Sequence, residues 1–237
     1  MLYYPKIETL YRRDEATHYV TPALRRPEFA VPQRWLLTEK IDGTNIRIPF
    51  YTGTEEPQEG VLTDSAAVGY CGRTDQAQIP NFLVQHLRET FTLDKMRACF
   101  DPGTKGILFG EGYGERIQKG GGNYRSGVSF RLFDVVVFGP EDFAWWLNWN
   151  DVEGVAAKLR IETVPVVSRS ASLVGAISTV QEGLGSAVAF LENRCMAVDA
   201  EGIVARTDPL LFDRRGQRLV WKLKARDFPM GMGWEEK

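Results

Sequence analysis

The chain contains 237 residues, of which 43% are hydrophobic and 25% are charged, as is typical of a globular protein with a substantial core. Its formal net charge of −2 excludes a globally basic nucleic-acid-binding protein, although one groove can still be basic. No apolar run approaches membrane-spanning length, and the three cysteines show no zinc-binding spacing, which favours a reduced, cytoplasmic protein.

Residues 1–34 are polar and carry prolines at positions 5, 22, 27 and 32, which predicts an irregular segment with little regular structure. Two arginine pairs lie in it, Arg12-Arg13 and Arg25-Arg26. Such pairs are able to contact phosphate, but exposed pairs are more often simply solvated, and we favour solvation here.

The next stretch predicts a strand, a tight turn and a second strand. Residues 35–38 are apolar and β-leaning, and residues 46–51 alternate between apolar and polar until Pro49. The turn between them holds Lys40 and an Asp-Gly pair. A lysine beside a sharp turn is a candidate nucleophile, but Asp-Gly is also a common hairpin turn. These residues alone therefore favour an ordinary hairpin.

Carboxylates mark two of the strands predicted in the middle of the chain. After an amphipathic helix over residues 81–100, broken near residue 91, a buried strand over residues 106–114 carries Glu111 between glycines. A strong strand over residues 129–139 contains Phe133 and Asp134, which alternation places on opposite faces. A charge inside such an apolar strand is costly unless it is paired or used.

The last third predicts two short helices over residues 141–159, a strand over residues 161–167 and a helix over residues 172–182. Glu201 then begins a strand-like stretch. In the final strand, strict alternation puts Lys222 and Lys224 on one face. Two adjacent lysines repel each other unless an anion lies close to both.

Several of these stretches together resemble a known family. Lys40-Ile41-Asp42-Gly43-Thr44-Asn45 resembles the motif K-x-D-G-x-N of covalent nucleotidyltransferases. Four further motifs follow in the family's order: Phe109-Gly110-Glu111, Phe133-Asp134, Glu201-Gly202-Ile203-Val204 and Lys222-Leu223-Lys224. Asn45 resembles ATP-dependent RNA ligases of the T4 RNA ligase 2-like family, since DNA ligases and capping enzymes usually carry arginine there. Asp42 departs from that type, which has histidine.

The resemblance implies a role for each motif residue. The expected catalytic residues are Lys40, as the nucleophile, and Lys222 and Lys224, which contact the α-phosphate. The expected nucleotide-binding residues are Glu39, Asp42, Gly43, Asn45, Arg73, Glu111 (ribose) and Phe133 (adenine stacking). The expected metal ligands, direct or through water, are Glu201 and Asp134. The implied cofactors are ATP and Mg²⁺ or Mn²⁺.

The resemblance also implies an α+β nucleotidyltransferase fold, related to ATP-grasp-like ligases, of two antiparallel β-sheets flanked by helices with ATP in the cleft between the sheets. Because few residues follow Lys224, we expect residues 1–237 to form a single adenylyltransferase domain without an appended C-terminal domain.

The implied activity is nucleic acid end joining in RNA repair. A lysyl-AMP intermediate passes AMP to a 5′-phosphate end, and a 3′-hydroxyl displaces it. The expected partner is nicked or annealed RNA, the expected state is a monomer, and no membrane is involved. Three alternatives stay open: a minimal DNA ligase, a nucleotidyltransferase that only adenylylates ends, and a non-catalytic nucleic-acid end-binding protein.

Overall fold

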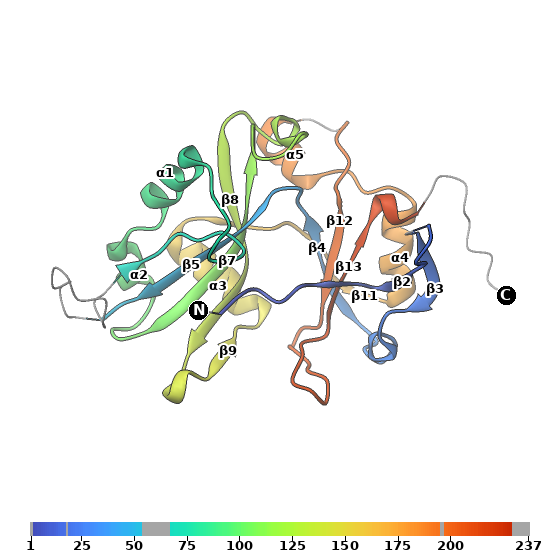
Figure 1. Ribbon diagram of the computed structural model, residues 1–237, viewed down its shortest axis with the longest axis horizontal. Coiled ribbons are helices and arrows are strands. Elements are labelled where there is room, and N and C mark those ends of the chain that lie inside the picture. The colour runs from blue at the N-terminus through green and yellow to red at the C-terminus, as the bar shows by residue number, and fades with distance from the viewer. Residues whose placement is uncertain (1, 18, 54–66, 195–196, 229–237) are drawn as a thin grey trace. The chain divides into compact units, whose positions relative to one another are not determined.

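The computed structural model describes residues 2–17, 19–53, 67–194 and 197–228 (Figure 1). The chain forms two compact units. Unit 1 contains residues 1–4 and 43–163, and unit 2 contains residues 5–42 and 164–237. None of the helices in the described part of the chain is both long enough and apolar enough to cross a membrane.

Unit 2 is built on a five-stranded sheet. Its strands, in spatial order, are β1 (Glu8–Thr9), β13 (Val220–Lys224), β12 (Gly202–Arg206), β4 (Trp35–Lys40) and β11 (Val166–Ala171). All neighbours are antiparallel except β1 and β13, which are parallel. Further elements of this unit are β2 (Tyr11–Arg13), β3 (Val20–Leu24), η1 (Pro27–Ala30), α5 (Ala187–Asn193) and η4 (Ala225–Asp227).

The core of unit 2 lies on one face of this sheet. Alternation along the strands turns Trp35, Leu37, Ile203 and Trp221 to that face, where all four are fully buried. The helix α4 (Leu173–Gln181) packs on β4, β11, β12 and β13 (Figure 1). The opposite face carries Lys40 and the lysines of β13.

Unit 1 is built on a six-stranded sheet. Its main path is β10 (Glu162–Thr163), β8 (Val128–Phe138), β7 (Lys105–Gly114), β5 (Thr44–Tyr51) and β6 (Ala67–Val68), and β9 (Ala144–Trp146) pairs with β8. Only the β10–β8 pair is parallel. The other elements are α1 (Asn81–Thr90), α2 (Leu93–Cys99), η2 (Gly121–Asn123), η3 (Pro140–Asp142) and α3 (Trp149–Leu159). The helices α1 and α3 pack on β8, and α2 packs on α3 (Figure 1).

The structure confirms the broken helix and corrects three expectations. The predicted helix over residues 81–100 is α1 followed by α2, and the Thr92 side chain caps α2. The N-terminal segment is not irregular, because it forms β1, β2 and β3. Trp145 and Trp146 lie on β9 and not on a helix. The strands on either side of the Asp42-Gly43 turn are not a hairpin, because β4 and β5 belong to different sheets.

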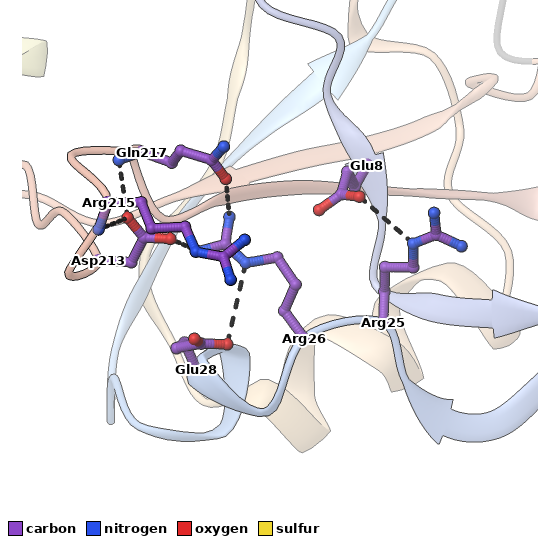
Figure 2. Close-up of polar contacts among 7 residues, drawn as sticks. All are labelled: Glu8, Arg25, Arg26, Glu28, Asp213, Arg215 and Gln217. Atoms are coloured by element: carbon purple, nitrogen blue, oxygen red, sulfur yellow. Dashed lines mark hydrogen bonds and ion pairs between the residues drawn. The ribbon is translucent and has the colours of Figure 1, made fainter.

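Salt bridges fix the N-terminal segment within unit 2 (Figure 2). The Nε atom of Arg25 lies 3.3 Å from Glu8 Oε1. The Nη2 atom of Arg26 lies 2.7 Å from Asp213 Oδ2, and Asp213 Oδ1 accepts the backbone N–H groups of Arg215 and Gln217 at 2.8 Å each. The segment before η1 is thereby tied to the loop that leads into β13.

Glu39 anchors β4 from the core face of the sheet. Its side chain is 2% exposed, accepts from the Ser186 hydroxyl at 2.6 Å and accepts from the Val188 N–H at 3.1 Å. Ser186 is the N-cap of α5, and its Oγ also accepts from the Ala189 N–H. The residue beside Lys40 therefore holds a helix N-terminus, where a carboxylate is favourable.

Changing Glu39 to alanine should lower the free energy of unfolding by about 1–3 kcal/mol, because the Ser186 hydroxyl and the Val188 N–H lose a buried acceptor. Urea unfolding followed by circular dichroism measures this loss. The control is Glu182→Ala, an exposed change at the end of α4, which should stay within about 0.5 kcal/mol of wild type. Equal stability of the two variants would contradict the anchoring role.

A second stability prediction concerns pH. Hydrogen bonds from the Gln217 and Arg215 backbone and the charge of Arg26 outweigh desolvation and hold the pKa of Asp213 below its ordinary value of 3.8. A depressed pKa stabilises the fold above the unfolded pKa, and this stabilisation is lost as the pH falls through the folded pKa. Asp213→Asn should therefore melt at a lower temperature than wild type at pH 7, and the gap should close towards pH 3. A gap that is constant over this range would show that the carboxylate charge is not responsible.

Candidate active site

Strand register brings the lysines of unit 2 together. Lys40 ends β4, and its neighbour across the strands is Gly202, which in turn lies opposite Lys224. Two residues further along each strand, Thr38 lies opposite Val204, and Val204 lies opposite Lys222. Because directly paired residues share a face, Lys40, Lys222 and Lys224 project from the same side of the sheet, as alternation predicted for the last two.

A single carboxylate joins two of these lysines. Lys40 Nζ lies 2.5 Å from Glu201 Oε2, and Lys224 Nζ forms an ion pair with Glu201 Oε1. The three side chains are only 14–22% exposed. Burial raises the pKa of Glu201, but the charge of Lys40 and hydrogen bonds from Lys224 and Lys40 outweigh it and hold that pKa below its ordinary value. Glu201 is therefore ionised and provides the anion that the neighbouring lysines require.

Gly202 is needed for this arrangement. Its φ of +151° is rarely adopted by residues with a side chain, and a Cβ atom there would lie 2.1 Å from the carbonyl oxygen of Leu223. The glycine lets β12 approach β13 closely at the point where Glu201 turns between the two lysines.

A second group of motif residues lies in unit 1. Asn45 on β5 lies directly opposite Glu111 on β7. The Oδ1 atom of Asn45 is buried and has no hydrogen-bond partner among the described residues. Gly43 lies beside this pair, where a Cβ would fall 2.4 Å from the Gly112 carbonyl oxygen and 2.8 Å from Glu111 Cγ. An unsatisfied buried acceptor beside a partly buried carboxylate is a place where a ligand donor would fit.

Phe133 and Asp134 lie at an irregularity of β8. Phe109 pairs with Asp134 and Gly110 pairs with Leu132, so Phe133 is the extra residue of a bulge. Asp134 is 1% exposed and accepts from the Tyr4 hydroxyl at 2.8 Å and from the Val135 N–H at 3.2 Å. The Tyr4 ring meets Phe133 edge-on, with 5.0 Å between centroids. Tyr4 thus provides a buried hydrogen-bond donor to Asp134, and nothing in the sequence near Tyr4 pointed to it.

Arg73 and Asp42 are exposed. The arginine that the sequence reading missed is Arg47, which is fully buried. Its guanidinium donates to the Gly72 carbonyl at 2.7 Å and to Asp75 Oδ1 at 2.7 Å, and it therefore braces the backbone that carries Arg73. Its position in an alternating strand gave no signal of this long-range contact.

The protein does not supply a complete metal cage within the described residues, since no three His, Cys, Asp or Glu side chains gather there as a metal-binding group. Glu201 and Asp134, the two candidate ligands, belong to different units. Mg²⁺ is commonly held by one or two carboxylates together with substrate phosphates and water, and a single carboxylate such as Glu201 fits that mode of binding.

Comparison with solved structures gives the fold. An RNA ligase mutant from Naegleria gruberi with ATP and Mn matches with a TM-score of 0.57 and 18% identity, over 84% of this chain and 52% of that one. A second mutant of the same ligase with ATP and Mn matches with a TM-score of 0.58 and 17% identity, over 94% of this chain and 62% of that one. A third mutant, with AMP and Mn, matches with a TM-score of 0.57 and 18% identity, over 94% of this chain and 62% of that one. The chain thus spans between half and two thirds of the length of these ligases.

Comparison with curated protein sequences finds no significant match. The family model described as RNA ligase matches residues 33–224, a range that contains Lys40, Glu201, Lys222 and Lys224 as well as the Glu111 and Phe133 motifs. This range covers most of the chain. The chain therefore belongs to the RNA ligase family.

Proposed function

We propose that the protein is an ATP-dependent RNA ligase in which Lys40 becomes covalently joined to AMP. The observation that carries the proposal is the cluster of Lys40, Glu201 and Lys224, in which a candidate nucleophile lies beside a second cation on the same face of the sheet. Membership of the RNA ligase family and the likeness to ligase structures with ATP and Mn support it.

In the proposed first step, the ammonium group of Lys40 gives one proton to solvent, and the resulting neutral amine attacks the α-phosphorus of ATP. A nitrogen–phosphorus bond forms, the bond from phosphorus to the bridging oxygen breaks, and pyrophosphate leaves with the electron pair, while the amine proton passes to solvent. Lys222 and Lys224 stay cationic on the same face and stabilise the negative charge that develops on the phosphate.

Glu201 changes partners in this scheme. In the free protein its two oxygens engage Lys40 and Lys224. Once Lys40 carries AMP it is no longer an ammonium ion, and the Oε2 atom of Glu201 becomes available. We propose that Glu201 then holds a divalent ion, Mg²⁺ or Mn²⁺, directly or through water. Such an ion would shield the phosphate charge.

For Asp134, the hydrogen bonds from Tyr4 and Val135 favour an additional role in shaping the bulge that carries Phe133. We propose that Phe133 stacks on adenine, and that Glu111 and Asn45 bind the nucleoside with Gly43, Asp42 and Arg73 nearby. The backbone of Glu39 is proposed to lie beside the nucleotide, because its carboxylate is occupied by α5.

The later steps are AMP transfer to a 5′-phosphate and displacement of AMP by a 3′-hydroxyl, with nicked or annealed RNA as substrate. Asn45 supports RNA, since it stands at the position where the sequence resembles RNA ligases. We further propose a monomeric, cytoplasmic protein whose two units act as one adenylyltransferase domain.

Changing Lys40 to alanine should abolish the covalent AMP label, because the only proposed nucleophile is removed. The fold should persist, since Glu201 keeps Lys224 as its ion-pair partner. The measurement is incubation with labelled ATP and Mg²⁺, followed by denaturing electrophoresis and peptide mapping. Lys158→Ala, which removes an exposed lysine of α3, is the control and should label like wild type. A label on the same peptide of Lys40→Ala would exclude Lys40 as the nucleophile.

Nicked duplexes that differ only in the sugars at the 3′-hydroxyl side test the choice of RNA. RNA there should be sealed about tenfold faster than DNA, the effect of one 2′-hydroxyl hydrogen bond of about 1.4 kcal/mol. Equal rates would favour the minimal DNA ligase. Labelled protein and adenylylated ends without sealed product would instead identify an enzyme that only adenylylates ends. Absence of any lysyl-AMP would favour a non-catalytic end-binding protein.

A further inference from the structure

A basic cavity of about 650 Å³ lies within unit 2. Its lining residues are Lys6, Ile7, Glu8, Thr9, Arg13, Arg25, Lys222, Lys224 and Arg226. The strands β1, β2 and β13 contribute part of this lining, and Thr9 lies directly opposite Lys222 in the sheet. The cavity is therefore lined both by residues of the N-terminal segment and by the two lysines that the proposed mechanism places at the α-phosphate.

The charge of the lining is strongly positive. It comprises six lysines and arginines and one carboxylate, in a protein whose formal net charge is −2. A concentration of one sign of charge in a concave site attracts anions of the opposite sign.

Several of these cations are held in place. Arg13 Nη2 lies 2.5 Å from Oδ1 of the buried Asp227, and Asp227 Oδ2 accepts the backbone N–H of Lys224. The guanidinium of Arg25 points to Glu8 (Figure 2). Fixed guanidinium groups lose little side-chain entropy when they bind an oxyanion.

The same lining indicates what kind of anion fits. Among the residues that the structure describes, the lining contains no aromatic side chain on which a base could stack, and apart from Ile7 its side chains are charged or hydroxyl-bearing. Proteins that bind single-stranded nucleic acid combine a basic groove with stacking aromatics. A lining with cations alone suits a compact polyphosphate better than an RNA strand.

We propose that this cavity binds the β- and γ-phosphates of ATP and, after the first step, the pyrophosphate that they become. The proposal rests on the proposed function, because Lys222 and Lys224 would then face the α-phosphate on one side and the leaving group on the other. It assigns phosphate binding to Lys6, Arg13, Arg25 and Arg226, none of which belongs to the motifs of the family. The Arg12-Arg13 and Arg25-Arg26 pairs, expected to be merely solvated, each contribute one residue to this cavity.

The test is direct binding of inorganic pyrophosphate by isothermal titration calorimetry, which needs no catalysis. The variant is Lys6→Ala/Arg226→Ala, since both side chains are exposed and can be removed without opening the core. It should bind pyrophosphate at least about tenfold more weakly, the loss expected for two charge-assisted contacts. The matched control, Lys158→Ala/Arg214→Ala, removes two exposed cations elsewhere and should bind like wild type. The charge-preserving variant Lys6→Arg/Arg226→Lys should restore most of the affinity.

Each other outcome has a defined meaning. Wild-type affinity in Lys6→Ala/Arg226→Ala, or no pyrophosphate binding by wild type, would overturn the inference. Unchanged pyrophosphate affinity with reduced affinity for a uridine 12-mer would likewise overturn it and assign the cavity to the RNA backbone. Failure of wild type to form lysyl-AMP, with pyrophosphate binding intact and sensitive to the variant, would sink the proposed function while leaving the phosphate site standing.

Discussion

The cluster around Lys40 depends on one constraint: lysines placed side by side in a partly buried position need an anion between them. Glu201 meets that need with both of its carboxylate oxygens. Its position is set by the antiparallel register of β4, β12 and β13, and by a glycine that lets two strands approach closely. The sheet thus holds one carboxylate between two lysine side chains. A reaction that neutralised Lys40 would remove the ion-pair partner of Glu201 Oε2, while Oε1 would keep its contact with Lys224.

Features that depend on local pattern were predictable from the sequence. Alternation placed Lys222 and Lys224 on one face, and the apolar spacing over residues 81–100 predicted a helix with a break. Features that depend on partners far away in the chain could not be predicted from the sequence. The turn after Lys40 has the residues of a hairpin, yet β4 pairs with β12, more than 160 residues away, because that pairing buries Trp35 and Leu37 in a shared core. Tertiary burial outweighed local turn preference.

In the candidate site too, local motifs were predictable from the sequence and long-range contacts were not. Motif residues were found because they lie in short, recognisable stretches. The groups that position them were missed: Tyr4 bonds Asp134 from 130 residues away, and α5, which holds Glu39, was not predicted at all. A tyrosine in a polar N-terminal segment carries no local sign of burial. Arg12, Arg13 and Arg25 are exposed, as the sequence predicted, but the sequence carried no sign of the cavity that Arg13 and Arg25 line.

The division of the chain between the units has a consequence for biosynthesis. Unit 1 draws almost all of its residues from one continuous stretch, 43–163, whereas unit 2 combines residues 5–42 with residues 164–237. Its core joins Leu10 and Trp35 to Trp221. The two neighbours of β4 in the sheet, β11 and β12, are both made after residue 163, so every residue of the sheet of unit 1 has been synthesised before β4 can complete its pairing. The strand that carries Lys40 is made early and paired late, so Lys40 gains its carboxylate partner, Glu201, only after some 160 further residues have been made.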